Sequence, residues 1–404
     1  DSIAEHLLGD ARTSAALAVM LLCILLTGCE NVLKSIFIGT GRVKYNALSE
    51  LGEQLIRMVL VLLLVYKLAN GDQGFTVFLI IVGMTLSELY SVSMLSLSYR
   101  RCFLLGNQAG SIAVKRGGVA KPFLKLLLPS SATALITNLF SSACTIILPV
   151  RLMVAGFSRS EAVSALGVIS GMIMPLMFLP MALIGAISAV LMPGISAVFE
   201  NKSLLFGKIS RAIRAVGFIA MPFTAMLLPL VPTLCGLLFH IEVDKTLIAL
   251  LGIDTILTYY LIISISILNG KTQNEYVFRY ALVGEGLQLG LAWMLAALPQ
   301  LAVYGYVLAI MAGDLVRLSL NLKRIATVCG VSALSPKWFI GPFVTAALTL
   351  LYSKAIFGLL SANMSSVPAA LTITILSIAI LSFMIIRLFG IHPYQYWKRS
   401  FFKL

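Results

Sequence analysis

Long apolar windows separated by short polar breaks run through almost the whole chain. Each window has about 20 or more residues and few charges, the length that an α-helix needs to cross the ~30 Å hydrocarbon core of a bilayer. The windows lie near residues 14–34, 46–68, 75–98, 123–150, 162–191, 215–239, 246–268, 276–298, 300–322, 338–361 and 367–390. The pattern predicts an all-α polytopic membrane protein with about 11 transmembrane helices.

The fifth window, 162–191, is the least clear, because its apolar run continues to Phe199 and is too long for one straight crossing. The run holds Pro175, Pro180 and Pro193, which predict a broken helix; at membrane depth a broken helix is tolerated only against protein or a water-filled cavity. Its beginning is better defined. The sequence SRSE, from Ser158 to Glu161, predicts a capping box at a helix N-terminus.

Composition supports the membrane assignment. The 404 residues are 59% hydrophobic and only 11% charged, with a mean hydropathy of +1.00, whereas soluble domains carry about 25% charged residues. The net charge of +14 comes from Lys and Arg in the short segments between windows, so we expect no nucleic-acid partner. The six cysteines include no CxxC pair; neither a metal site nor a cofactor is expected.

The distribution of basic residues orients the predicted bundle. When Lys and Arg are counted over alternate loops, 23 of the 30 fall on one side and six on the other, leaving Arg57 inside a window. Cytoplasmic loops carry the excess of Lys and Arg. We therefore expect a multi-pass protein of the bacterial cell membrane, with a cytoplasmic C-terminus and with Asp1 outside.

Two basic segments outside the windows divide the chain. Residues 105–121 form the longest basic connector and predict a cytoplasmic linker between a first lobe, residues 1–104, and a second lobe, residues 122–390. The end of the chain, residues 391–404, reads HPYQYWKRSFFKL after Ile391 and mixes aromatic with basic side chains. Such a mixture is typical of an amphipathic tail at the membrane surface.

Charged side chains inside the second window are the first candidate site. Glu53, Gln54 and Arg57 interrupt an otherwise apolar run, and a charge in hydrocarbon must be paired or face a wet cavity. Glu53 and Arg57 are four residues apart and share one helix face. Two interpretations remain open: an internal ion pair that only supports packing, or a cavity in which Arg57 alternates between Glu53 and an anionic substrate.

Arg151 ends the fourth window near the predicted outer face. It could extend to the membrane interface, as long basic side chains do, or bind a phosphate through its planar guanidinium.

Further acids lie within or beside apolar windows. Glu88, Asp254 and Glu285 are candidates for ion coupling, since intramembrane acids generally face a bundle interior. Asp314 lies three residues before Arg317, which favours a structural ion pair there. Asp254 has no basic residue three or four positions away on its own helix.

Two blocks of sequence resemble a known family. The first, SIFIGTGRVKYNALSELGEQLIRM, carries Gly39, Ala47, Ser49, Glu53, Gln54 and Arg57. The second, PVRLMVAGFSRSEAVSALGVISGMIMPLMFLP from Pro149 to Pro180, is followed by LMPGISAVFE. Both resemble the stage V sporulation protein B-like polysaccharide transporters of the multidrug/oligosaccharidyl-lipid/polysaccharide (MOP) exporter superfamily, which are related to lipid II flippases. Tyr45, Ile38 and Val150 depart from the family pattern.

The resemblance implies a two-lobed bundle of the MOP/MATE type. That family has fourteen spans, and the best registration makes our first window its fourth span. The chain is therefore expected to lack the first three spans, which leaves the N-terminal lobe incomplete.

The resemblance also implies a function. We expect a flippase that moves undecaprenyl-pyrophosphate-linked saccharides by alternating access, acts as a monomer among membrane lipids and has no enzymatic activity. One alternative is a cation-coupled exporter of organic cations, a class in the same superfamily. A second is a membrane-embedded polysaccharide polymerase or glycosyltransferase, for which the predicted external loops are short and no catalytic residues stand out.

Overall fold

The computed structural model describes residues 14–40, 42–69, 71–104, 116–198, 200–330, 337–364 and 366–388. Within these ranges every regular element is a helix. The chain divides into two compact units, residues 1–114 and residues 115–404. The tail at 391–404 and most of the basic linker at 105–121 lie outside the described residues.

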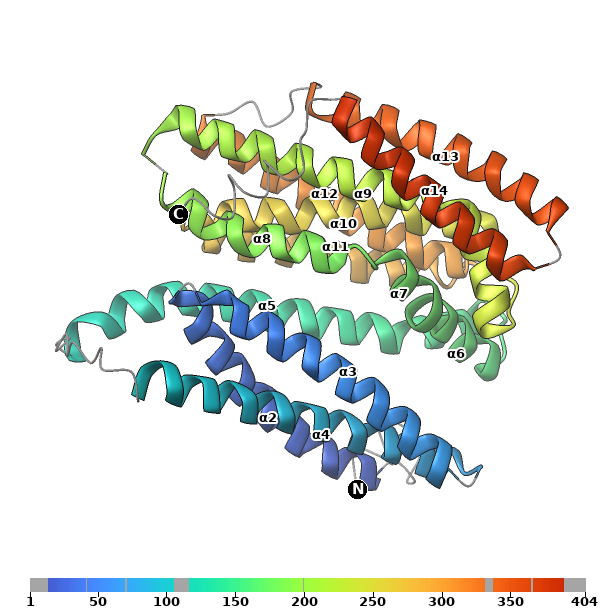
Figure 1. The fold of residues 1–404 in the computed structure, drawn as a ribbon, viewed down its shortest axis with the longest axis horizontal. Coiled ribbons are helices and arrows are strands. Elements are labelled where there is room, and N and C mark those ends of the chain that lie inside the picture. The colour runs from blue at the N-terminus through green and yellow to red at the C-terminus, as the bar shows by residue number, and fades with distance from the viewer. Residues whose placement is uncertain are drawn as a thin grey trace. The chain divides into compact units, whose positions relative to one another are not determined.

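The first unit is a bundle of three long helices (Figure 1). These are α2 (Ser14–Gly39), α3 (Val43–Leu68) and α4 (Gln73–Tyr99), and a π-helical turn, η2 (Arg100–Leu104), continues α4. Both α2 and α3 pack against α4. Two glycines permit the close approach of α3 and α4, since a Cβ atom on Gly52 would lie 2.8 Å from the Tyr90 ring and one on Gly83 would lie 2.7 Å from Val61.

The second unit contains the remaining helices. In chain order they are α5 (Arg116–Val154), α6 (Arg159–Gly167), η3 (Val168–Ile173), α7 (Met174–Met177), α8 (Met181–Ser196), α9 (Lys202–Phe239), α10 (Lys245–Gly270), α11 (Asn274–Leu295), α12 (Val303–Cys329), α13 (Lys337–Asn363) and α14 (Val367–Leu388). Helix α10 lies at the centre of this unit, packed against α8, α9 and α12, while α11 packs between α5 and α12 and α13 lies against α9 and α14 (Figure 1).

The predicted fifth span is a broken helix. Helix α6 passes into the π-helical turn η3 and the short α7, and the chain then turns at Phe178 to Pro180 before α8 begins. The predicted capping box is present, because the Ser158 side chain accepts a hydrogen bond from the Glu161 N–H and the Glu161 carboxylate accepts one from the Ser158 N–H at 2.8 Å. The break falls at Pro180, whereas Pro175 lies in the first turn of α7 and Pro193 lies inside α8.

Helix α9 corrects the predicted boundary of the sixth span. It begins at Lys202 and contains 38 residues, whereas the sequence predicted a span from 215 and a cytoplasmic loop before it. The basic residues at 202–214 therefore lie on helical turns. Asn201 caps this helix, and its side chain accepts a hydrogen bond from the Leu204 N–H at 3.1 Å.

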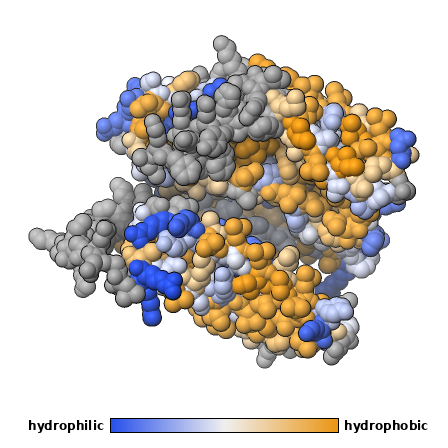
Figure 2. Space-filling view, viewed as in Figure 1, coloured by the Kyte–Doolittle hydropathy of each residue, from blue (hydrophilic) through white to orange (hydrophobic). Residues whose placement is uncertain are grey.

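The predicted all-α membrane architecture is confirmed. Eight helices of the described chain are long and apolar enough to cross a membrane. The other three predicted spans, 46–68, 276–298 and 367–390, correspond to α3, α11 and α14, which contain 26, 22 and 22 residues. Hydrophobic residues dominate the surface drawn in Figure 2, as expected for helices that face lipid. The chain is a multi-pass membrane protein.

Candidate functional site

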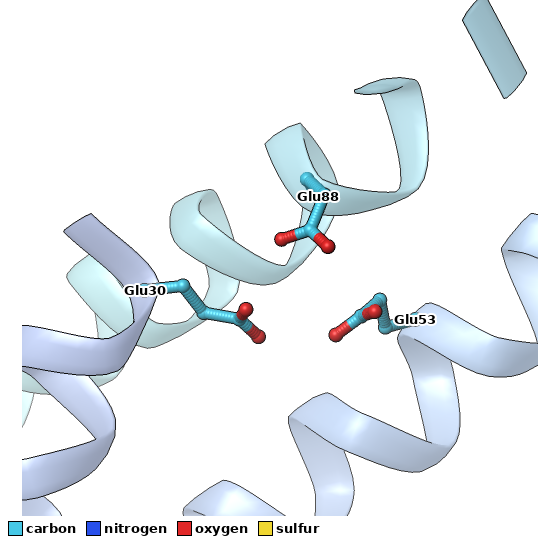
Figure 3. A group of neighbouring side chains, drawn as sticks. All are labelled: Glu30, Glu53 and Glu88. Atoms are coloured by element: carbon cyan, nitrogen blue, oxygen red, sulfur yellow. The ribbon is translucent and has the colours of Figure 1, made fainter. Parts of the chain in front are cut away.

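Three glutamates from three different helices meet in the first unit (Figure 3). Glu30 lies on α2, Glu53 on α3 and Glu88 on α4, and one carboxylate oxygen of each lies within 4.8 Å of the others. The three residues are buried, with exposed fractions of 3%, 4% and 7% of the whole residue. Buried carboxylates require compensation by cations or hydrogen-bond donors, and the surrounding side chains supply both.

Two basic side chains compensate these glutamates. Lys34 Nζ lies 2.9 Å from Glu30 and 3.9 Å from Glu53. Arg57 pairs with Glu53 and lies 3.1 Å from Glu88. The predicted Glu53–Arg57 ion pair is therefore present, and it belongs to a larger network that joins all three helices.

Serine hydroxyls complete the network. Ser91 donates a hydrogen bond to Glu30 and lies against Ser49, while Arg57 Nε donates to Ser87 Oγ at 3.2 Å. Glu88 Oε2 is buried and has no hydrogen-bond partner among the described residues. We define the unit 1 cluster as Glu30, Lys34, Glu53, Arg57 and Glu88; with all five groups ionised it carries one excess negative charge.

Two protein cations already neutralise most of the charge of the three glutamates. The carboxylates could in principle serve as oxygen ligands to a metal ion. The Lys34 ammonium and the Arg57 guanidinium contact them, so a divalent cation would have to compete with both. An arginine shared between two carboxylates can instead be released to an anion that approaches it.

The two Arg57 partners are more deeply buried than Arg57 itself. The Arg57 side chain is 26% exposed, against 6% for Glu53 and 9% for Glu88. Gln54, which the sequence grouped with them, is exposed. It lies one position past Glu53 on α3, so its side chain points away from the cluster. Gln54 does not join this site.

A second charged cluster lies in the second unit. Arg317 of α12 pairs with Glu285 of α11 and with Asp314, three residues earlier on its own helix. Thr258 of α10 donates a hydrogen bond to the other Asp314 oxygen at 2.8 Å. The predicted Asp314–Arg317 pair is thus present, and Glu285 shares the same arginine.

Asp254 lies on the face of α10 that carries Thr258, one turn earlier. The residue is 2% exposed, and its Oδ1 atom has no hydrogen-bond partner among the described residues. No ion pair joins it to a described basic side chain. We define the unit 2 cluster as Asp254, Glu285, Asp314 and Arg317; three acids there face one arginine, so a proton or a monovalent cation would reduce the excess negative charge.

Arg151 lies in neither cluster. It ends α5, where its guanidinium carbon lies 4.2 Å from the centre of the Trp293 ring and its Nε donates to the Trp293 carbonyl at 2.9 Å. These contacts anchor the end of α5 to α11. They explain the position of Arg151 without a phosphate.

Sequence reasoning missed two members of the unit 1 cluster. Glu30 and Lys34 are four residues apart near the end of the first window, the same spacing that identified Glu53 and Arg57. The charge count placed Lys34 among the loop residues, whereas α2 continues to Gly39 and Lys34 lies on this helix. The sequence did carry a signal for this pair: an acid followed four residues later by a base is the favourable order for an ion pair on one helix face.

The architecture defines the class of protein: a polytopic membrane protein with the fold of the MATE transporters. A crystal structure of MATE in the bent conformation matches with a TM-score of 0.57 and 18% identity, covering 78% of this chain and 69% of that one. An inward-facing multidrug resistance MATE family transporter of the MOP superfamily matches with the same score and identity, covering 78% and 71%. A MOP superfamily transporter from Pyrococcus furiosus, described as having a binding pocket of reverse polarity, matches with a TM-score of 0.56 and 16% identity, covering 79% of each chain.

Among curated proteins, the chain is similar to stage V sporulation protein B of Bacillus subtilis strain 168. The two are 23% identical over 341 residues, which cover 82% of this chain and 64% of that protein. The chain thus spans about 64% of the length of this relative. The predicted resemblance is confirmed, while no family model matches the chain.

Proposed function

We propose that the chain belongs to a membrane transporter, rather than an enzyme, that moves an anionic lipid-linked saccharide outward across the bacterial cytoplasmic membrane by alternating access. The MATE-type fold and the similarity to a stage V sporulation protein support transport. The undecaprenyl-pyrophosphate-linked class is the substrate that the sequence resemblance implies.

One observation carries the proposal: Arg57 is partly exposed while both glutamates that hold it are buried. A guanidinium offers a planar fork that matches phosphate oxygens. In the proposed cycle, Arg57 leaves Glu88 to bind the headgroup phosphate, and Glu53 keeps it in place. Closing of the binding site returns Arg57 to both glutamates and releases the anion.

The energy source is the membrane potential in this proposal. Moving a negative headgroup outward across an inside-negative membrane is favoured by about 2.3 kcal/mol per charge per 100 mV. The basic ends of the helices support the proposed cytoplasmic C-terminus. In unit 1 these are the α2–α3 connection and the end of α4, and in unit 2 the beginning of α9 and the end of α12.

The test is transport of a labelled undecaprenyl-pyrophosphate-linked saccharide in proteoliposomes that contain the full-length protein. Arg57→Ala should slow the lipid's crossing by ~10-fold or more, since a hydrogen bond to a charged group contributes about 1.5–3 kcal/mol. Arg57→Lys should restore part of the rate. Arg279→Ala, which removes an exposed ion pair with Glu275, is the matched control. A wild-type rate no faster than that of empty liposomes would refute the proposal.

A second candidate function, cation-coupled export, is favoured by the buried and unpartnered oxygen of Asp254. In this alternative, a proton or monovalent cation binds Asp254 and is exchanged during export of an organic cation. Asp254→Asn should abolish gradient-dependent efflux and leave the protein folded, while Glu275→Gln should have no effect. Efflux that persists in Asp254→Asn would exclude this function.

A further inference from the structure

The exposed side of α3 carries a strip of polar side chains. Glu50, Gln54 and Arg57 follow one another at spacings of four and three residues, so they lie on one face of the helix. Glu50 and Gln54 are exposed, and Arg57 is partly exposed. Gln54 lies near the middle of this 26-residue helix, at a depth where an amide without hydrogen-bond partners is costly. The polar strip therefore requires contact with a polar group.

A strip of apolar side chains runs beside the polar strip on the same helix. Its members recur at spacings of three or four residues and are all exposed: Leu48, Leu51, Leu55, Met58 and Leu62. Leu51 directly follows Glu50, and Leu55 directly follows Gln54, so the two strips lie side by side along the helix. The exposed side of α3 thus fits an amphiphile, with a polar headgroup against one strip and a hydrocarbon chain against the other.

The polar groups of Glu50 and Gln54 are available to hydroxyl groups. The Gln54 amide forms no hydrogen bond with any other described residue. Lys34 Nζ lies 3.6 Å from a Glu50 oxygen, yet the Glu50 side chain is 63% exposed. An amide offers two donors and an acceptor, whereas a carboxylate offers acceptors alone. Together they match a sugar, whose hydroxyl groups both donate and accept hydrogen bonds, and the Glu50 carboxylate would repel a phosphate at the same position.

Arg57 connects the polar strip to the proposed phosphate contact. Arg57 lies one turn beyond Gln54, while Glu50 lies one turn before it, nearer the α2–α3 connection on the proposed cytoplasmic side. The rise along the helix from Glu50 to Arg57 is about 10 Å. A sugar joined to a phosphate at Arg57 therefore reaches Gln54 and Glu50 in the direction of the cytoplasm.

We propose that Glu50 and Gln54 form a saccharide subsite, in which they hydrogen-bond the hydroxyl groups of the sugar next to the phosphate. This inference rests on the proposed role of Arg57 as the phosphate ligand. The subsite is separate from the buried acids of the unit 1 cluster, because Glu53 and Glu88 hold Arg57 whereas Glu50 and Gln54 select what the phosphate carries. The first isoprenoid units lie against the apolar strip.

The experiment is native mass spectrometry of the detergent-purified full-length protein, titrated separately with undecaprenyl pyrophosphate and with undecaprenyl-pyrophosphate-linked N-acetylglucosamine. Wild type should bind the lipid with the sugar more tightly. Gln54→Leu should reduce this preference by ~2–10-fold, the effect of one neutral hydrogen bond, and Glu50→Ala should reduce it as well. Asn363→Leu, which removes an exposed amide at the end of α13, is the control and should keep the wild-type preference.

Arg57→Ala separates this subsite from the proposed function, because it should weaken the binding of both lipids. Unchanged binding of undecaprenyl pyrophosphate by Arg57→Ala would refute the phosphate contact, and with it the position of the sugar. If Arg57→Ala weakens both lipids but Gln54→Leu and Glu50→Ala keep the wild-type preference, the saccharide subsite alone is overturned. It is also overturned if wild type binds both lipids equally, or if Gln54→Leu lowers the unfolding temperature and keeps the preference, since the polar strip then packs against protein.

Discussion

At the scale of single residues, two glycines determine how closely α11 and α12 approach beside the unit 2 cluster. A Cβ atom on Gly284 would lie 2.1 Å from Arg317 Cγ, and one on Gly313 would lie 2.8 Å from the Gly284 carbonyl oxygen. No other residue type fits at either position without displacement of a helix. The aliphatic part of Arg317 thus lies directly on the α11 backbone, which holds its guanidinium against Glu285 and Asp314.

We expect Gly284→Ala to destabilise the protein, because the new methyl group displaces Arg317 from its two acids. Overpacking of a buried site costs about 1–3 kcal/mol. Gly286→Ala on the same helix meets nothing within 4 Å and should stabilise the helix by ~0.5–1 kcal/mol. Thermal unfolding in detergent measures both, and a higher unfolding temperature for Gly284→Ala than for Gly286→Ala would contradict the packing described here.

The ion pairs within one helix could be predicted from sequence, and the contacts between helices could not. Spacings of three and four residues identified Asp314–Arg317 and Glu53–Arg57, since such pairs share a helix face. Nothing in a single sequence shows that Glu88 and Glu285 reach an arginine on another helix. Those contacts depend on helix rotation and register, which close packing determines.

At the scale of elements, the beginning of α10 is joined to the beginning of α12 by one carboxylate. Asp244 caps α10 by accepting a hydrogen bond from the Thr246 N–H at 3.1 Å, and its second oxygen accepts one from Tyr304. The hydrogen bond from Tyr304, followed by that from the Thr246 backbone, lowers the pKa of Asp244 below its ordinary value of 3.8. The ionised form is therefore the one that the folded connection favours.

This lowered pKa predicts an acid-sensitive connection. A group whose pKa is lower in the folded state contributes its full stabilisation above the ordinary value, and the contribution is lost as the pH falls below 3.8 through the folded-state pKa. Hydrogen exchange of the first α10 amides should show protection that decreases over that range. Asp244→Asn, which retains a capping oxygen without the charge, should show protection independent of pH; an unchanged pH dependence in this variant would refute the assignment.

Helix boundaries could be predicted from the sequence where a capping motif was recognised. The prediction was wrong where charged residues made a helix look like a loop. The Ser158–Glu161 pattern correctly located the beginning of α6. The beginning of α9 was missed because the basic residues after Asn201 were interpreted as loop, although Asn is a strong capping residue. Basic helical turns in a membrane protein resemble loops in hydropathy, since both lie outside the hydrocarbon.

At the scale of the whole molecule, the sequence predicted the class of fold because hydrophobicity alone separates membrane spans from connections. The order of the spans and their helical character are confirmed. The break between α7 and α8 could be anticipated from proline. The sequence placed the acids inside apolar windows. It could not show which partners each acid contacts within its unit.

The proposed orientation makes a prediction for the whole chain. Lys245 and Lys271 flank α10, a helix of 26 residues and therefore about 39 Å long. In a background without native cysteines, Lys245→Cys should react with an impermeant maleimide added outside intact cells, while Lys271→Cys should react only after permeabilisation. The reverse labelling would place the C-terminus outside.

Helix α9 contains 38 residues, which corresponds to about 57 Å, nearly twice the ~30 Å thickness of the hydrocarbon core. Its first turns, with Lys202, Lys208 and Arg211, must project into the lipid headgroups or beyond them. These turns belong to the same helix as the deep turns that pack beside α13. Attraction between the cationic end of α9 and anionic lipid headgroups therefore acts directly on a helix of the packed bundle.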